Sequence, residues 1–175
     1  MRMVKWLEVY STDTALLSQK AEELQVHPLA IEDCYNRDHR AKLDDFGNHQ
    51  FLVWFMLAQG KVYEIQFLIF SDQLIVVPHD APPHGQSWRE YLKISNGHKD
   101  VWHLLYNALD RATDITWQET NLLFSEIDDF EQEIFKKNFN PQELLTVKKQ
   151  LNQIDYSVGH LSSVAKQLQN LCKPT

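Results

Sequence analysis

The segment from Val101 to Lys137 constrains the fold most, because it contains neither glycine nor proline. A single helix over this range is about 55 Å long at 1.5 Å per residue. A domain of this size does not need such a helix inside its core, so we expect a stalk-like helix. Its apolar positions recur at helical spacing and form one stripe: Val101, Leu104, Leu105, Ala108, Leu109, Ala112, Ile115, Leu122, Leu123, Ile127, Phe130 and Ile134.

A second helical segment begins at Asn140-Pro141, where an asparagine cap precedes a proline suited to a first helical turn. Apolar or small residues then follow in steps of three and four, which predicts a packing seam along one long helix. The seam comprises Leu144, Val147, Leu151, Ile154, Val158, Leu161, Ala165, Leu168 and Cys172. Together the two segments predict a helical hairpin.

The N-terminal half has a mixed pattern. We expect a strand over 3–10, a helix over 14–26 capped by Ser11, Thr12 or Asp13, and a short helix over 28–36 after the break at His27-Pro28. Three apolar runs, 51–57, 62–70 and 74–78, are separated by turn residues and predict a three-stranded meander.

These patterns predict an α+β fold: a three-layer α/β/α domain with a mixed sheet, followed by long helices that form a stalk-like hairpin. The expected division is an α/β domain over 1–98 and a long-helix segment over 99–175, which ends before any transmembrane helix.

The composition excludes several classes of protein. A net charge of −7 argues against nucleic acid or anionic lipid as the main partner. The longest apolar run, residues 51–58, is far too short to span a membrane, so we expect a soluble, cytoplasmic chain. Cys34 and Cys172 show no metal spacing and are expected to be reduced thiols. No phosphate-binding loop or known catalytic motif is present, so we expect no enzyme.

Two acidic pairs are the candidates for chemistry. Glu32 and Asp33 fall at the end of the short helix, where the helix dipole repels negative charge. Asp110 and Asp114 are four residues apart and therefore share one face of the long helix. Either a divalent cation such as Mg²⁺ neutralises these acids, or nearby basic residues do, namely Arg37, Arg40, Lys42 and Arg111.

The order of motifs resembles the cytoplasmic N-terminal domain of the CorA-type magnesium transporter family. The run 27–33 (HPLAIED) is followed by Asn36, Arg40 and Lys42 and then by the first apolar strand. Downstream, residues 100–110 (DVWHLLYNALD) resemble the start of the family's first long helix.

The resemblance implies a regulatory domain that senses intracellular Mg²⁺ between subunits of a homopentamer and couples occupancy to pore gating. It implies that Asp33 binds the ion, that Glu32 and Asp110 lie nearby, and that Asp114 is a weaker match. Co²⁺, Ni²⁺ or Zn²⁺ are further candidate ions. The full-length protein is then expected at the cytoplasmic face of the inner membrane.

The sequence also departs from the family. Ala41 stands where the family usually has proline, and Cys34 replaces the hydrophobic residue after the acidic pair. The Gly-Met-Asn tripeptide and the membrane helices of the pore are missing. Because the apolar seam of the second helical segment still continues at Cys172, we expect an excised soluble part of a transporter, in preference to a free-standing relative without a pore.

Three other readings stay open at this point. The first is the domain of a related zinc transporter, which the eight histidines make possible. Zinc binding through His79 or His84 would support it. A pore-less helical scaffold that recruits a partner helix is the second. A metal-dependent hydrolase is the third and is disfavoured, because no nucleophile, base and oxyanion donor can be named together.

Overall fold

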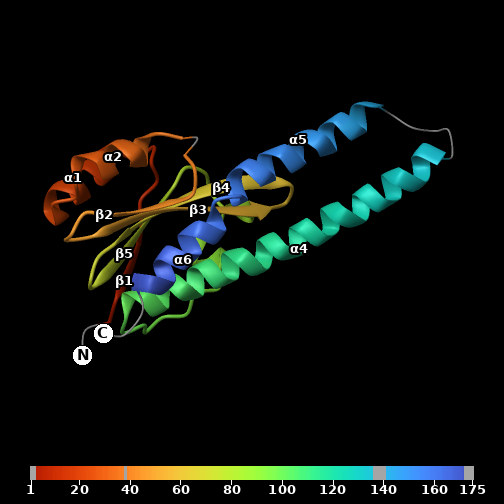
Figure 1. Cartoon of the computed structure of the whole chain (residues 1–175). Helices are drawn as coiled ribbons and strands as arrows, with labels where there is room; N and C mark the ends of the chain where they lie inside the picture. The colour runs from red at the N-terminus through yellow and green to blue at the C-terminus, as the bar shows by residue number, and fades with distance from the viewer. Residues whose placement is uncertain (1–2, 38, 136–140, 172–175) are drawn as a thin grey trace.

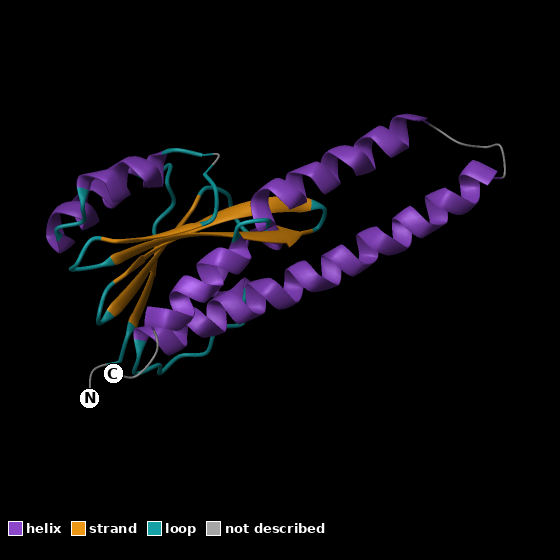
Figure 2. Cartoon of the chain, viewed as in Figure 1, coloured by secondary structure: helices purple, strands orange, loops and turns teal. Residues whose placement is uncertain are grey.

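The computed structural model describes residues 3–37, 39–135 and 141–171. A five-stranded sheet lies between two layers of helices, and the long helices project beyond it (Figures 1 and 2). The α+β class, the three layers and the mixed sheet predicted from the sequence are confirmed.

The strands are β1 (Lys5–Glu8), β2 (Lys42–Asp45), β3 (Gln50–Ala58), β4 (Lys61–Ile69) and β5 (Gln73–Pro78). Their order across the sheet is β1-β5-β4-β3-β2, with β1 parallel to β5 and all other pairs antiparallel. The predicted meander is β3 to β5. Ala58 pairs with Lys61, and the two-residue turn between them has positive φ at Gln59 and Gly60, as this tight hairpin requires.

Strand β2 was not predicted, because its sequence KLDD carries three charged residues and no apolar alternation. Such a short, charged strand is typical of a sheet edge, where it discourages pairing with other chains. It lies at the edge of the sheet next to β3.

Helices α1 (Thr14–Leu24) and α2 (Pro28–Tyr35) cover one face of the sheet (Figure 1). Asp13 caps α1 by accepting a hydrogen bond from the Leu16 amide at 3.1 Å. His27 caps α2, and Pro28 occupies its first turn, as expected from the break at this point. A 3₁₀ turn (Pro83–Gly85) and α3 (Trp88–Tyr91) complete the connection to the long helices.

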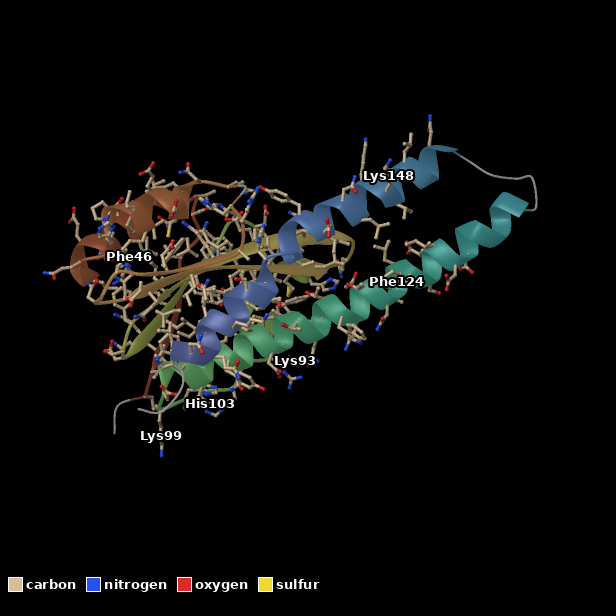
Figure 3. All side chains as sticks on the ribbon, viewed as in Figure 1. Phe46, Lys93, Lys99, His103, Phe124 and Lys148 are labelled. Carbon is tan, nitrogen blue, oxygen red and sulfur yellow. The ribbon has the colours of Figure 1, made fainter. Side chains whose placement is uncertain are left out.

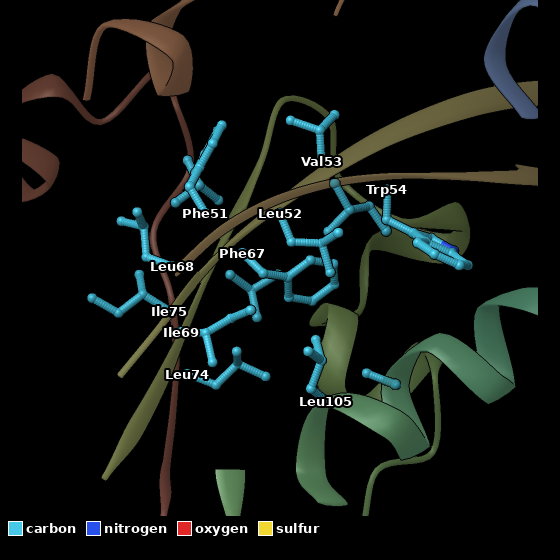
Figure 4. Close-up of a cluster of buried hydrophobic side chains, with 14 of the residues drawn as sticks. Phe51, Leu52, Val53, Trp54, Phe67, Leu68, Ile69, Leu74, Ile75 and Leu105 are labelled. Carbon is cyan, nitrogen blue, oxygen red and sulfur yellow. The ribbon is translucent and has the colours of Figure 1, made fainter. Parts of the chain in front are cut away.

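Helix α4 (Val101–Phe135) confirms the predicted long helix as far as the structure describes it; residues 136–140 lie outside the described ranges. Asp100 caps it through hydrogen bonds from the amides of Trp102 and His103. Its first turns pack on the other face of the sheet, where Leu52 and Phe67 point toward Leu105 (Figure 4). The boundary between 98 and 99 stays a prediction.

The prediction of one long second helix was wrong. Helices α5 (Pro141–Val158) and α6 (Leu161–Leu171) are separated by a turn at Gly159-His160. Glycine disfavours a continuous helix. The break also changes the buried face, because Val164 and Leu168 are buried in α6 while Ala165 of the predicted seam is exposed. The returning helix thereby packs beside α4 and against β2 (Figure 1).

A substitution at Phe67 tests whether burial between the sheet and α4 stabilises the fold. Phe67→Ala is expected to lower the free energy of unfolding by about 3–5 kcal/mol, because it empties space between the sheet and α4. Phe124→Ala, the same truncation at an exposed position on the far half of α4, is expected to change it by less than about 0.5 kcal/mol (Figure 3). Urea denaturation followed by circular dichroism measures both, and equal losses would contradict this account of the core.

Candidate cation site

The acidic pair of α2 is neutralised in part within the chain. Asp33 lies in the last turn of α2, and its Oδ2 is 2.6 Å from the Nζ of Lys42 on β2. Lys42 also lies 3.0 Å from an oxygen of Asp44. The sequence left open whether a cation or a basic residue neutralises these acids. In the isolated chain, the basic residue Lys42 partly neutralises Asp33.

Lys42 is held firmly in its charged form. Partial burial, the largest single effect, works against the charge. The hydrogen bonds and ion pairs with Asp33 and Asp44 outweigh it, so the pKa of Lys42 lies above its ordinary value. The ammonium group occupies the place between two carboxylates where a bound cation would also be attracted.

The acids near Lys42 line a shallow hollow of about 440 Å³. Its charged residues are Glu32, Asp33, Asp44 and Asp45, with Lys42 as the one base. Four negative charges and one positive charge leave a net of −3 there. Leu29 and Phe46 complete the wall. Asp44 and Asp45 were not singled out by sequence reasoning, because the unpredicted strand β2 is what brings them beside α2.

The other predicted basic neighbours have different partners. Arg37 pairs with Asp80 at 3.4 Å, and Arg40 lies over the ring of Tyr156 on α5. His39 is 3.9 Å from the carboxylate of Asp33 and contributes charge only when protonated. Glu32 is exposed, and no partner of its carboxylate is found among the described side chains. The excess negative charge of the hollow is therefore left for solvent or for a bound cation.

The backbone of Asp33 is fixed by a polar cluster beneath α2. Its carbonyl oxygen accepts hydrogen bonds from the Asn36 amide and from the side chain of Gln66, each at 3.1 Å, and lies 3.1 Å from the His39 ring. Gln66 also donates to Glu64 at 2.8 Å. The last turn of α2 is thus tied to β4 in the middle of the sheet.

The same cluster continues to His79. The Nε2 of His79 lies 3.1 Å from the Gln66 amide nitrogen and 3.6 Å from Glu64, and its Nδ1 lies 2.7 Å from the hydroxyl of Ser11. Sequence reasoning missed this cluster. The signal was available, because Glu64 and Gln66 alternate onto one face of an otherwise apolar strand.

The structure does not bring all four predicted metal residues together in one chain. Asp110 and Asp114 lie on α4, which packs on the opposite face of the sheet from α2. Asp110 lines a different hollow with Lys93, on the far side of the sheet from Phe46 (Figure 3). Asp114 lies 4.0 Å from Arg111. Within the described ranges, no three acid, histidine or cysteine side chains converge as ligands for one metal ion.

Cys34 is a free thiol on the buried side of α2, as expected, and Cys172 lies outside the described residues. Burial raises the pKa of the Cys34 thiol, and the neighbouring charge of Asp33 adds to this effect. The thiol therefore stays protonated and belongs to the core and not to the cation site.

None of the helices over the described ranges is both long and apolar enough to cross a lipid bilayer. With the fold and the acidic hollow established, the chain can be compared with known proteins. The sequence model of the CorA-like Mg²⁺ transporter protein matches residues 2–173. The chain belongs to this family.

Relatives of this CorA-like chain agree with the assignment. YfjQ of Bacillus subtilis (strain 168), a protein provisionally named as a metal ion transporter, is 32% identical over 117 residues. That alignment covers 62% of this chain and 35% of YfjQ, so the chain spans about one third of this relative.

Two solved structures share the fold at low sequence identity. The CorA magnesium transporter of Methanocaldococcus jannaschii matches 97% of this chain and 56% of its own, with a TM-score of 0.76 and 12% identity. The cytoplasmic domain of ZntB from Vibrio parahaemolyticus matches 96% of this chain and 70% of its own, with a TM-score of 0.74 and 12% identity. The resemblance to the CorA family that was inferred from the sequence is thereby confirmed.

The cluster beneath Asp33 predicts a specific loss of stability in acid. Burial, the largest effect, tends to raise the pKa of Glu64, but His79 and Gln66 outweigh it and the pKa lies below its ordinary value of 4.5. A lowered pKa in the folded state stabilises the protein above pH 4.5, and this contribution is lost as the pH falls through the folded value. In Glu64→Gln the unfolding free energy is therefore expected to fall less steeply from pH 5 to pH 3 than in the wild type.

Denaturant unfolding at each pH measures this difference. Glu90→Gln, at an exposed capping position remote from the cluster, is the matched control and should keep the wild-type slope. Parallel pH profiles for wild type and Glu64→Gln would show that Glu64 carries no such linkage.

Proposed function

We propose that this chain is the cytoplasmic regulatory part of a CorA-like divalent cation transporter, and that Mg²⁺ bound at the acidic hollow between subunits controls the pore. Co²⁺, Ni²⁺ and Zn²⁺ are further candidate ions. The observation that carries the proposal is the hollow itself, which is lined by four carboxylates and by a single ammonium group, that of Lys42. The longer protein is proposed to lie at the cytoplasmic face of the inner membrane, with its membrane contact through transmembrane helices beyond this sequence.

The chemistry of the hollow suits a weakly held, hydrated ion. Mg²⁺ gives up its water reluctantly and is bound by one or two carboxylates with several waters retained. Asp33 and Asp44 are the nearest pair, both already beside one cation, the ammonium of Lys42. A divalent ion would compete with this ammonium, which keeps the affinity low. A low affinity is what a sensor of an abundant ion requires.

The placement of the acids supports a site shared between subunits. In a closed ring each subunit meets the next through two different surfaces. Glu32 and Asp33 lie on one face of the sheet, and Asp110 and Asp114 lie on the helix that covers the other. At a subunit interface of a homopentamer, acids on two such surfaces repel each other unless a cation lies between them. The ion would then favour the closed ring only through its higher affinity for that state.

A zinc transporter domain remains the second candidate, favoured by the shared fold with the ZntB cytoplasmic domain. Its proposed histidine ligands are poorly placed. The His79 side chain is buried and engaged with Ser11 and Gln66, whereas His84 is exposed and hydrogen-bonded to Gln59. Zinc binding through His79 would first have to disrupt the cluster beneath α2.

A scaffold without transport function is disfavoured by membership of the CorA-like family. Two apolar segments of about twenty residues in the gene downstream of Thr175 would rule it out. We propose no catalytic activity, because the family consists of transporters and the candidate site holds carboxylates and a lysine without a placed nucleophile.

The proposal is tested by unfolding the chain thermally across a Mg²⁺ titration at constant ionic strength. Ion binding to the folded state alone is expected to raise its stability by about 1.4 kcal/mol at ten times the dissociation constant, roughly 3–5 °C in the midpoint. Asp33→Asn should lose this response, whereas Asp155→Asn, the same change at an exposed site on α5, should keep it. Sedimentation of the same samples reports whether Mg²⁺ also promotes assembly.

The variant Lys42→Met is expected to change the Mg²⁺ response in the opposite direction. Removing the competing ammonium leaves Asp33 and Asp44 without their counter-ion, so this variant is expected to unfold at a lower temperature without Mg²⁺ and to respond more strongly to it. A full Mg²⁺ response in Asp33→Asn, or an unchanged one in Lys42→Met, would contradict a site at this hollow. A response to Zn²⁺ alone that is lost in His84→Ala would favour the zinc transporter instead.

A further inference from the structure

Four aromatic rings form a stacked column at the end of the sheet beside the acidic hollow. His27 stacks on Phe46 with 4.4 Å between the ring centroids, and Phe46 stacks on His49 with 5.3 Å. His49 in turn stacks on Phe70 with 5.1 Å. The column joins the start of α2 to the turn between β2 and β3 and to the end of β4. Phe46 also lines the acidic hollow (Figure 3).

The hydrogen bonds around His49 determine which of its ring nitrogens carries the proton. The Nδ2 of Asn48 donates to the carbonyl oxygen of Gln25, at the end of α1, at 3.0 Å. The oxygen of the same Asn48 side chain is therefore the atom that lies 2.7 Å from the Nδ1 of His49, and it can only accept. In neutral His49 the proton thus lies on Nδ1, and Nε2 carries a lone pair.

The Nε2 of His49 is buried and has no hydrogen-bond partner among the described residues. The whole residue is 1% exposed. Burial, the largest effect, lowers the pKa of His49, and the charge of His27 lowers it further. The opposing effect of Asp45 is smaller, so the pKa lies below its ordinary value of 6.5. His49 therefore binds a proton more readily when it is released into water than in its packed position.

Two titratable neighbours act on this position from either side. The Nδ1 of His27 accepts a hydrogen bond from the Leu29 amide at 3.3 Å and caps α2. Protonation would turn this nitrogen into a donor, remove the cap and place a positive charge across Phe46 from His49. Asp45 at the end of β2 opposes this effect, and its Oδ1 accepts from the Gly47 amide at 2.9 Å.

We propose that His49 makes the packing of the β2–β3 turn, residues 46–49, against the junction of α1 and α2 dependent on pH, and that mild acid releases this turn. The proton binds Nε2 in the released state, because this nitrogen is covered in the packed state. Acid therefore shifts the population toward the released turn while the central strands stay paired.

Release has a consequence for the acidic hollow, because it removes Phe46 from the wall. A cation at Asp33 would then be bound more weakly in mild acid. This consequence rests on the proposed function, whereas the release of the turn does not.

Amide hydrogen exchange at pH 7.5 and pH 5.5 tests the release, in a buffer that contains EDTA and no divalent cation. The amide of Phe46, which donates to the carbonyl oxygen of His49 at 3.0 Å, reports on the turn. Its protection factor, corrected for the intrinsic exchange rate at each pH, is expected to fall at least about threefold at pH 5.5. The amides of β5 in the middle of the sheet are expected to keep their protection.

Two matched variants assign this response to His49. His49→Phe keeps a ring in the column but binds no proton, so the protection of the Phe46 amide should be the same at both pH values. His160→Phe, the same change at an exposed position in the turn before α6, should keep the wild-type fall. In the wild type, the NMR titration of the His49 ring should have the same midpoint as the loss of protection, a measurement that needs no variant to fold.

An equal fall in wild type and His49→Phe would assign the response to another group. An equal fall across β5 would show acid unfolding of the whole domain and no separate release of the turn. Protonation of the His49 ring while the Phe46 amide stays protected would show that the column accepts the charge, and would overturn the proposal. Because divalent cations are absent from this assay, none of these results depends on the Mg²⁺ proposal.

Discussion

The burial of β3 on both of its faces is the constraint on which the rest of the structure depends. Residues 51–58 are all buried, so the sheet must be covered by helices on each side. The pair α1 and α2 supplies one layer, and the first turns of α4 with α6 supply the other. This layering carries the acids of α2 and the acids of α4 to opposite faces of the sheet, so a single chain does not bring the two sets of acids together.

The acidic hollow depends on this sheet in a second way. Edge strand β2 contributes Lys42, Asp44 and Asp45, and the buried Gln66 of β4 holds the carbonyl of Asp33. The hollow is therefore connected to the core through strands β2 and β4. The ammonium of Lys42 already lies beside Asp33 and Asp44, so an ion that bound at Asp33, as we propose, would have to displace this ammonium.

The sequence predicted the class of the fold because its strongest signals were long-range periodicities. The stripe of α4 and the apolar run of β3 leave few alternatives for a chain of this size. Two elements were missed or wrong for local reasons. Strand β2 is too charged and too short to show an apolar alternation. The break at Gly159-His160 interrupts a seam whose residue types continue unchanged on both sides, so periodicity alone suggested one helix.

The candidate site was predictable in part. Glu32, Asp33 and Lys42 stood out because opposite charges crowd a helix end, and the structure places them together. Asp44 and Asp45 depend on the pairing of β2 with β3, which no local pattern revealed. Whether Asp110 and Asp114 meet the acids of α2 depends on contacts between chains, which the sequence of one chain does not encode locally.

The most direct test of the central claim is residue-resolved NMR of the chain during a titration with Mn²⁺, whose unpaired electrons broaden the signals of nearby nuclei. A site at the acidic hollow predicts that amides of residues 29–33 and 44–46 broaden first, and that excess Mg²⁺ restores them. Broadening that begins at the acids of α4 around Glu126–Asp129, with the amides of the hollow unaffected, would contradict a divalent cation site at Asp33.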